Sequence, residues 1–287
     1  MLIKTLLFFY SIALASIPIC DSQGFDFANM TPLGKGGQGA AMIVKSKDGK
    51  KPFVLKQYNK IRDYQRELRS LRKIRHPNVI EILCRRPDEL GLVIPLMSDG
   101  DLGRIQYGTS MQRIQFYVAQ LIRATHAIHR NGYVHCDIKP ANLVRHGDHI
   151  FLIDFGLAMR LDKINGRAGT RTTMSPEMAF RQGPLTEAVD WWSVGATIWM
   201  MSANALIPES ERNRRNMTPY RLEKDIESNE YVSLEEHDFP PQFDSFPALI
   251  DLIQVLMPRN PQNRRFRDIR LLQEHPFFES LDWSVFE

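Results

Sequence analysis

The sequence predicts an α+β protein with two lobes, a β-rich N-terminal lobe with one helix and a mainly helical C-terminal lobe. Three observations predict it: short β-branched runs separated by turn residues over 30–58, a helical apolar period over 111–130, and helical pieces from residue 185 onward. The pattern changes around 97–100, so the expected lobes are 27–96 and 97–283. With 287 residues, the chain is long enough for two cores.

Three short strands are expected over 30–58. A glycine-rich segment, Leu33-Gly34-Lys35-Gly36-Gly37-Gln38-Gly39, separates the first two, and Lys47-Asp48-Gly49-Lys50 is a hairpin turn signal before the third. A charged helix over 62–74 follows and is stopped by His76-Pro77-Asn78. Two more strands are expected at Val79–Leu83 and Leu90–Leu96.

The helix expected over 111–130 opens the second lobe, and Asn131-Gly132 caps it. Two short strands, Leu143-Val144 and Ile150–Ile153, flank the turn at His146-Gly147. The remainder is helical in pieces, with a polar stretch at 203–243 and no internal repeat.

The composition is that of an ordinary globular protein, 43% hydrophobic and 24% charged. A net charge of +4 does not argue for a nucleic-acid partner. Three cysteines, Cys20, Cys84 and Cys136, cannot build a disulfide framework, and a zinc site is unsupported.

Residues 1–20 are typical of a secretory signal peptide. Lys4 precedes an apolar run that ends in the small residues Ala13-Leu14-Ala15-Ser16. The run is short for a membrane span, so no stable span is expected. We therefore expect a protein of the secretory pathway or a secreted one, after removal of about 15–20 residues. A buried N-terminal helix or a short anchor, in a cytoplasmic protein, is the alternative.

The residues with the clearest chemistry are His135-Cys136-Asp137-Ile138-Lys139-Pro140-Ala141-Asn142, followed twelve positions later by Asp154-Phe155-Gly156. They place a carboxylate, a lysine and an amide in one loop and a second carboxylate in the next. Phosphoryl transfer from Mg-ATP needs such groups to orient a hydroxyl, bind Mg²⁺ and neutralise the moving phosphate.

These segments resemble the eukaryotic-type protein kinase family, whose motifs are H-R-D-L-x-x-x-N and D-F-G. Cys136 replaces the arginine and Ile138 the leucine, while the chemical residues stay in register. The resemblance implies that Asp137 and Lys139 are catalytic, the first accepting the hydroxyl proton and the second touching the γ-phosphate. It also implies that Asn142 and Asp154 hold Mg²⁺.

The same resemblance implies an ATP site in the first lobe. Glycines at 34, 36 and 39 would close on the phosphates, and Lys56 would contact the α/β-phosphates and pair with Glu67. The alternative for Glu67 is a solvated helix face among arginines. Ala41 stands where the family has valine, and Val54 where it usually has alanine. The residues expected to bind ATP are Leu33, Gly34, Lys35, Gly36, Gly37, Gln38, Gly39, Ala41, Val54, Lys56, Glu67 and Val144.

Later segments extend the resemblance to about 30–280. Gly169–Glu177 resembles G-T-x-x-Y-M-A-P-E, and Asp190-Trp191-Trp192-Ser193-Val194-Gly195 resembles D-x-W-S-x-G. By resemblance, Glu177 pairs with Arg264 and Asp190 braces the catalytic loop.

The function implied is ATP-dependent phosphorylation of serine or threonine on protein substrates. A catalytically dead pseudokinase acting as a binding scaffold is the alternative, and a kinase of small molecules is a third hypothesis. Asp99 and Asp101 indicate either a preference for basic residues before the target or simply a helix N-terminus.

Regulation by activation-loop phosphorylation is not expected. Cys136 has no fixed positive charge with which to bind a phosphate. No serine, threonine or tyrosine lies between Gly156 and Gly169. The competing interpretation is that Cys136 is a redox switch.

Overall fold

The computed structural model describes residues 17–21, 24–215, 217–224, 231–236, 239–264, 270–271 and 274–286. They form two compact units. The small lobe contains the described residues up to Arg72 together with Glu81–Leu96, and the large lobe contains Lys73–Ile80 and the chain from Met97 onward. The chain changes lobe after residue 96, where the sequence pattern placed the change, but Lys73–Ile80, predicted within the N-terminal lobe, belong to the large lobe.

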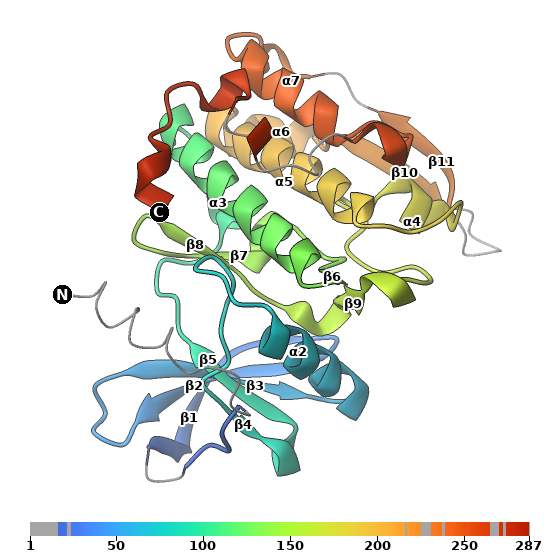
Figure 1. Ribbon diagram of the computed structural model, residues 1–287. Helices are drawn as coiled ribbons and strands as arrows, with labels where there is room; N and C mark the ends of the chain where they lie inside the picture. The colour runs from blue at the N-terminus through green and yellow to red at the C-terminus, as the bar shows by residue number, and fades with distance from the viewer. Residues whose placement is uncertain are drawn as a thin grey trace. The chain divides into compact units, whose positions relative to one another are not determined.

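The small lobe is an antiparallel sheet in the order β1-β2-β3-β5-β4, with one helix, α2 (Figure 1). The bounds are β1 Phe25–Gly36, β2 Gly39–Ser46, β3 Pro52–Tyr58, β4 Cys84–Arg86, β5 Gly91–Pro95 and α2 Ile61–Lys73. The predicted strands over 30–58 and the predicted helix are therefore present, with β1 starting earlier than expected.

The strand predicted over Val79–Leu83 is wrong. Val79 makes only an isolated bridge to Leu152, and the next ladder starts at Cys84. Val79, Ile80 and Ile82 are nevertheless buried. An apolar run of this length predicts burial, but burial alone does not pair a backbone.

The two faces of the sheet differ because successive side chains of a strand alternate. Leu55 of β3 lies opposite Val93 of β5, and Val93 lies opposite Cys84 of β4. These three residues and Val44 form a buried cluster on one face. Lys56, the next residue of β3, therefore points to the other face, where it contacts Glu67 of α2.

The large lobe is built on the long helices α3 and α5. α5 packs against both α3 and α7 (Figure 1). The helices are α3 Met111–Arg130, α4 Pro176–Phe180, α5 Ala188–Leu206, α6 Glu209–Arg215 and α7 Pro247–Leu256. α3 spans the residues predicted for it. It begins after Ser110, whose side chain accepts a hydrogen bond from the Arg113 amide, and ends at Asn131.

Three pairs of short antiparallel strands complete the described part of this lobe: β6 with β9, β7 with β8, and β10 with β11. Their bounds are β6 Tyr133–Val134, β7 Leu143–His146, β8 His149–Leu152, β9 Met159–Arg160, β10 Tyr220–Lys224 and β11 Tyr231–Glu236. The loop between β6 and β7 carries Asp137, so these ribbons fix the ends of the segment with the catalytic motif.

One disulfide joins Cys20 to Cys84 within the small lobe. Three cysteines were not expected to build a disulfide framework; two of them nevertheless form a single bridge, which the sequence pattern did not predict. Cys136 forms no disulfide and is buried. Residues 1–16, most of the expected signal peptide, lie outside the described residues, whereas Ile17–Cys20 lie beside β4.

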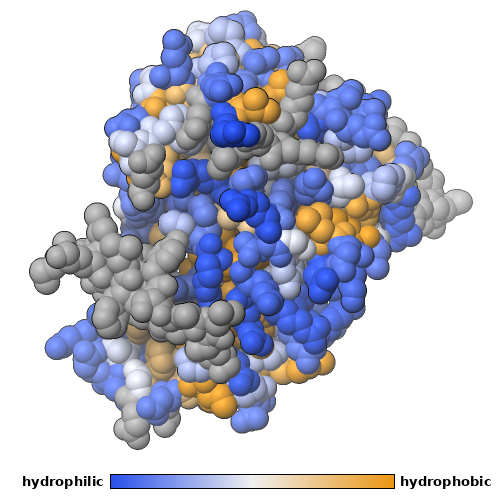
Figure 2. Space-filling view, viewed as in Figure 1, coloured by the Kyte–Doolittle hydropathy of each residue, from blue (hydrophilic) through white to orange (hydrophobic). Residues whose placement is uncertain are grey.

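The face of the molecule seen in Figure 2 is mainly hydrophilic, with small scattered hydrophobic patches. Within the described ranges, no helix combines the length and the apolar character needed to cross a membrane.

Candidate active site

Asp190, near the start of α5, fixes the backbone of the catalytic loop by hydrogen bonds. Its fully buried carboxylate accepts hydrogen bonds from the amides of His135 and Cys136, at 2.7 Å and 2.9 Å, and contacts His129 Nε2 at 2.9 Å. Burial by itself would raise the pKa of Asp190, but the hydrogen bond and charge of His129 lower it below its ordinary value. The bracing role predicted for Asp190 is present.

Asp137 is the centre of a polar network. Its Oδ2 lies 2.8 Å from Lys139 Nζ and accepts a 3.2 Å bond from Asn142 Nδ2, while its Oδ1 accepts a 2.6 Å bond from Thr170 Oγ1. Lys139 also contacts Thr170, at 2.7 Å. The predicted base and lysine therefore lie in direct contact, with the base only 6% exposed.

Thr170 is a member of this site that sequence analysis did not place there. The activation segment reaches the loop because Gly169 adopts a φ of +104°, and a Cβ at this position would lie 2.4 Å from the Cys136 carbonyl oxygen. The sequence signal for this contact is the glycine directly before the threonine. It predicts a close approach only if one knows that the backbone of Cys136 packs against Gly169.

The two residues predicted to hold Mg²⁺ are brought together by the backbone. The Ile153 amide donates to the Asn142 carbonyl at 3.0 Å, which places the following residue, Asp154, beside Asn142. Asn142 is also tied by its Nδ2 to the Asp137 carbonyl at 2.8 Å. Asp154 has a left-handed backbone, with φ of 66°.

These ligands suit Mg²⁺. An amide oxygen and a carboxylate are hard oxygen donors, and Mg²⁺ is usually held by one or two such groups together with substrate phosphates. Within the described ranges, no three His, Cys, Asp or Glu side chains are close enough to hold a metal by themselves. The donor set fits a metal that enters with a nucleotide.

The predicted ion pair of the small lobe is present. Lys56 Nζ lies 2.7 Å from Glu67 Oε2, and the Glu67 side chain is 1% exposed. The alternative of a solvated helix face is thereby excluded for Glu67. Lys56 projects from β3 and Glu67 from α2, so the pair also links the helix to the sheet.

The glycine loop lies at the β1–β2 hairpin, with Gly36 opposite Gly39. A Cβ at Gly39 would lie 1.8 Å from the Gln57 carbonyl oxygen, so packing against β3 requires a glycine. A Cβ at Gly34, Gly36 or Gly37 would meet no atom within 4 Å. No protein atom therefore blocks the backbone at these three glycines, so a phosphate group can approach it closely.

The other predicted ATP residues are placed as follows. Ala41 lies opposite Lys56 across the sheet, and Val54 precedes Lys56 by two positions on the same face. Val54 is buried, Leu33 and Lys35 are exposed, and Gln38 is intermediate. Val144 lies half-buried in β7 of the large lobe.

Asp99 and Asp101 are both engaged by backbone amides. Asp101 caps the 3₁₀ turn Leu102–Arg104 by accepting from Gly103 at 2.9 Å, and Asp99 accepts from Gly147 at 2.7 Å. The helix N-terminus interpretation therefore describes Asp101, while a preference for basic substrates stays a prediction.

One further prediction concerns an ion pair of the large lobe. Arg264 pairs with Glu177 through two contacts, one of them 2.9 Å between Nη2 and Oε2. Both side chains are buried. This is the pair expected from the resemblance of the two segments.

Comparison with known proteins agrees with this geometry. The protein kinase domain model matches residues 27–278. The chain is 27% identical over 278 residues to a RAC family serine/threonine-protein kinase homolog of Dictyostelium discoideum, covering 90% of this chain and 59% of that protein. It is 30% identical over 292 residues to mitogen-activated protein kinase 12 of Homo sapiens, covering 89% and 78% respectively.

Other relatives are much longer than this chain. Serine/threonine-protein kinase MRCK gamma of Homo sapiens is 29% identical over 290 residues, which are 91% of this chain and 18% of that kinase. The chain thus spans between about a fifth and three fifths of several relatives, and the shared part is the kinase domain. Since the match covers most of the sequence and the site geometry agrees with it, the chain belongs to the eukaryotic-type serine/threonine protein kinase family.

Proposed function

We propose that this protein transfers the γ-phosphoryl group of Mg-ATP to serine or threonine hydroxyls of protein substrates. The observation that carries the proposal is the network around Asp137, in which a buried carboxylate contacts Lys139, Thr170 and Asn142. A carboxylate held in this way can orient a hydroxyl and take its proton.

The remaining residues divide the work of binding. Lys56, held by Glu67, presents its ammonium group to the α/β-phosphates, and the backbone of Gly34–Gly39 covers the phosphates. Asn142 and Asp154 would hold Mg²⁺, and the ion would supply positive charge near the phosphates. Lys139 contacts the γ-phosphate and the base together.

The test is phosphate transfer from Mg-ATP to proteins of a cell extract, followed by identification of the modified residues. Asp137→Asn should lower the rate by about a hundredfold to ten-thousandfold while ATP binding persists, because only the base is lost. Asp148→Asn is the matched control, since that aspartate is 74% exposed in the β7–β8 turn. Equal phosphate incorporation by wild type and Asp154→Ala would contradict the proposal.

A pseudokinase scaffold is the competing function. It is disfavoured because Lys56, Asp137, Asn142 and Asp154 are all present and because the Lys56–Glu67 pair is formed. ATP binding without transfer to any protein in the same assay would favour the scaffold.

The protein acts in the secretory pathway or outside the cell. Support comes from Lys4, the apolar run after it and the small residues at 13–16, which together make the pattern of a signal peptide. The Cys20–Cys84 disulfide is also typical of oxidising compartments. Recovery of an intact, cytosolic Met1–Cys20 segment by mass spectrometry would refute this localisation.

A further inference from the structure

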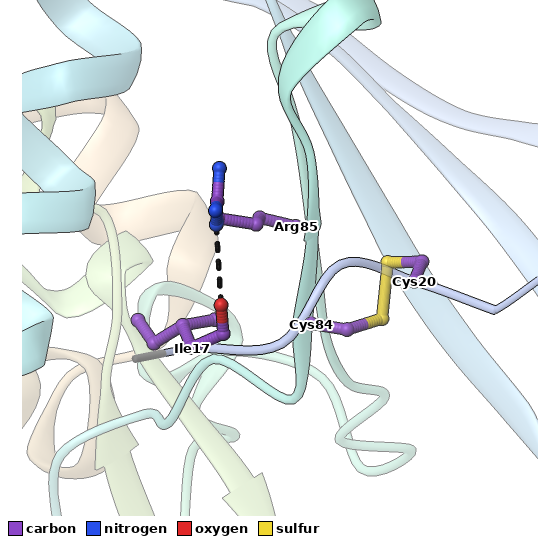
Figure 3. The surroundings of a disulfide bond; sticks show 4 residues. All are labelled: Ile17, Cys20, Cys84 and Arg85. Carbon is purple, nitrogen blue, oxygen red and sulfur yellow. Dashed lines mark hydrogen bonds between the residues drawn. A yellow bond between two sulfur atoms is a disulfide. The ribbon is translucent and has the colours of Figure 1, made fainter. Parts of the chain in front are cut away.

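The first described residues extend the small-lobe sheet beyond its edge strand, β4. The Arg85 amide donates to the Pro18 carbonyl and the Cys20 amide donates to the Arg85 carbonyl, both at 2.9 Å, in a parallel bridge. Arg85 Nε adds a 3.1 Å bond to the Ile17 carbonyl, as Figure 3 shows. An edge strand otherwise presents unpaired backbone groups, so Ile17–Cys20 protects this edge.

The segment is also fastened covalently. Cys20 and Cys84 are joined with their Cα atoms 4.9 Å apart (Figure 3). Cys84 is 5% exposed and belongs to the buried cluster with Val44, Leu55 and Val93. The bridge therefore fixes an interior position of the small lobe.

The position of Cys84 links this bridge to the nucleotide-binding strand. Cys84 lies opposite Val93, and Val93 lies opposite Leu55, the residue directly before Lys56. The ring closed by the disulfide spans a sequence separation of 64 and contains the glycine loop, Lys56 and Glu67. The disulfide therefore closes a loop that contains the strands carrying the expected ATP-binding residues.

We propose that Ile17–Cys20 is a retained part of the mature kinase, that the signal peptide is cut after Ala15, and that oxidation of Cys20 with Cys84 completes the small lobe. This inference rests on the proposed secretory localisation. The cut falls at Ala13-Leu14-Ala15, which has the small-x-small form of a signal cleavage site and ends before the buried residue Ile17. A cut after Cys20 would remove one half of the disulfide.

The oxidation is ordinary thiol–disulfide exchange with a disulfide-carrying oxidant of the secretory lumen. One cysteine thiolate attacks a sulfur of the carrier's disulfide. The S–S bond of the carrier breaks, its second sulfur is released as a thiolate, and a mixed disulfide forms between the protein and the carrier. The second cysteine thiolate then displaces the carrier, which departs as a dithiol. Two electrons pass from the protein to the carrier, and the two cysteines release two protons. The kinase consequently becomes fully competent only after it has left the reducing cytosol.

The processing part is tested on the secreted protein. Its N-terminus is determined by mass spectrometry, and a digest without reductant is searched for linked peptides. We expect Ser16 as the first residue and a peptide pair joined through Cys20 and Cys84. A mature N-terminus at Asp21 or later, or both cysteines recovered as thiols, overturns the proposal, and a kinase assay on the same sample reports the enzymatic function separately.

The functional part compares the secreted protein before and after treatment with a phosphine reductant. Reduction should lower the melting temperature by roughly 5–15 °C and raise the KM for ATP about threefold or more. Cys20→Ser should match the reduced wild type and should not respond to the reductant. A chain beginning at Asp21 also loses the backbone bonds to Arg85, so it should not respond to the reductant and should melt at or below the temperature of the reduced wild type. Cys136→Ser is the matched control, because it should keep the difference between the oxidised and reduced forms whatever its own activity. If oxidised wild type and Cys20→Ser share one melting temperature and one KM for ATP, the disulfide has no such role.

Discussion

Glu67 carries a negative charge that is almost fully buried. It is 1% exposed and lies 2.7 Å from Lys56 Nζ, so the pair fixes the ammonium group from one side. A buried charge that loses its partner is destabilising because its desolvation is no longer compensated. The pair therefore serves both the stability of the small lobe and the position of the phosphate-binding lysine.

Glu67→Gln should lower kcat/KM at least about tenfold, because Lys56 loses the charge that orients it. The measurement is steady-state kinetics with ATP as the varied substrate, together with a thermal melt. Glu89→Gln makes the same chemical change in a pair with Arg86 that is partly exposed, and it should change kcat/KM little. Equal effects of the two substitutions would contradict the role of Glu67.

His76 makes the small segment Lys73–Ile80 sensitive to acid. Its pKa is lowered from 6.5 to about 4, first by burial and then by the positive charges of Arg123 and His126. Its Nδ1 also accepts a 3.1 Å bond from the Asn78 amide, which a proton on that nitrogen would remove. The folded protein therefore keeps this ring neutral at pH values at which the unfolded chain already binds a proton.

The stability linked to His76 should be complete above about pH 6.5 and should be lost as the pH falls from about 6.5 towards 4. The whole effect is about 3 kcal/mol at most, from a pKa difference of about 2.5. Thermal melts of wild type and His76→Asn at pH 7 and pH 5 measure it, with the exposed His149→Asn as control. If His76→Asn loses as much stability on acidification as wild type, His76 does not titrate in this way.

At the scale of elements, the activation segment is ordered by apolar packing. Cys136 lies in a buried cluster with Val134, Met174 and Met178. Five side chains of the segment pack against this cluster: Leu157, Met159, Leu161, Ile164 and Ala168. The position that carries arginine in the family motif is here part of a hydrophobic core. Cys136 therefore offers no positive charge that could bind a phosphate on the activation segment.

We therefore expect the enzyme to be active without phosphorylation of its activation segment. The measurement is phosphatase treatment followed at once by an assay, before the enzyme can phosphorylate itself again. Activity should be retained, because the packing that orders the segment needs no phosphate. Activity that collapses and returns only with phosphate on Thr172 or Thr173 would contradict the prediction.

Cys136→Arg should destabilise the large lobe by about 3 kcal/mol or more, because it buries a charged group among apolar side chains. Cys136→Ala, the matched control, removes only the sulfur and should cost about 1.5 kcal/mol or less. Urea unfolding followed in the large lobe measures both. Similar losses for alanine and arginine would show that the cluster tolerates charge.

At the scale of the whole molecule, the two lobes are stabilised by separate devices. A covalent bridge closes the small lobe in addition to the Lys56–Glu67 pair, whereas the large lobe has an ion pair in which both side chains are buried, Glu177–Arg264. Arg264 also donates to the carbonyls of Pro258 and Ala188 and lies over the ring of Trp192. One guanidinium thereby joins α4, the start of α5 and the chain after α7.

Arg264→Leu should lower the free energy of unfolding of the large lobe by about 3–5 kcal/mol, because Glu177 is left charged and buried. Chemical denaturation gives this value. Arg113→Leu breaks a pair with Asp148 in which both side chains are more than half exposed, and it should cost less than about 1 kcal/mol. Comparable losses of unfolding free energy in the two variants would mean that burial of the Glu177–Arg264 pair does not contribute to stability.

Several features could be predicted from the spacing of residues along the chain alone. The distances between Asp137, Asn142 and Asp154 along the chain predicted a phosphoryl-transfer site because a short loop keeps such groups together in space. The apolar periods predicted the strands of residues 30–58 and the helix at 111–130, since each pattern repeats within one element. Glu67 followed from a motif and a helix period, and the structure places it on Lys56.

Other contacts between distant residues became visible only in the folded structure. Cys20 and Cys84 are 64 positions apart, and nothing local to either one indicates the other. Thr170 reaches Asp137 because Gly169 permits close approach to another loop. Val79–Leu83 forms no ladder of its own because its backbone pairs only at isolated points, with Leu152 through Ile80 and with Val93 through Leu83. Local patterns report which side chains become buried or which backbone conformations are favoured, but the partner across a contact is chosen by the packing of the whole chain.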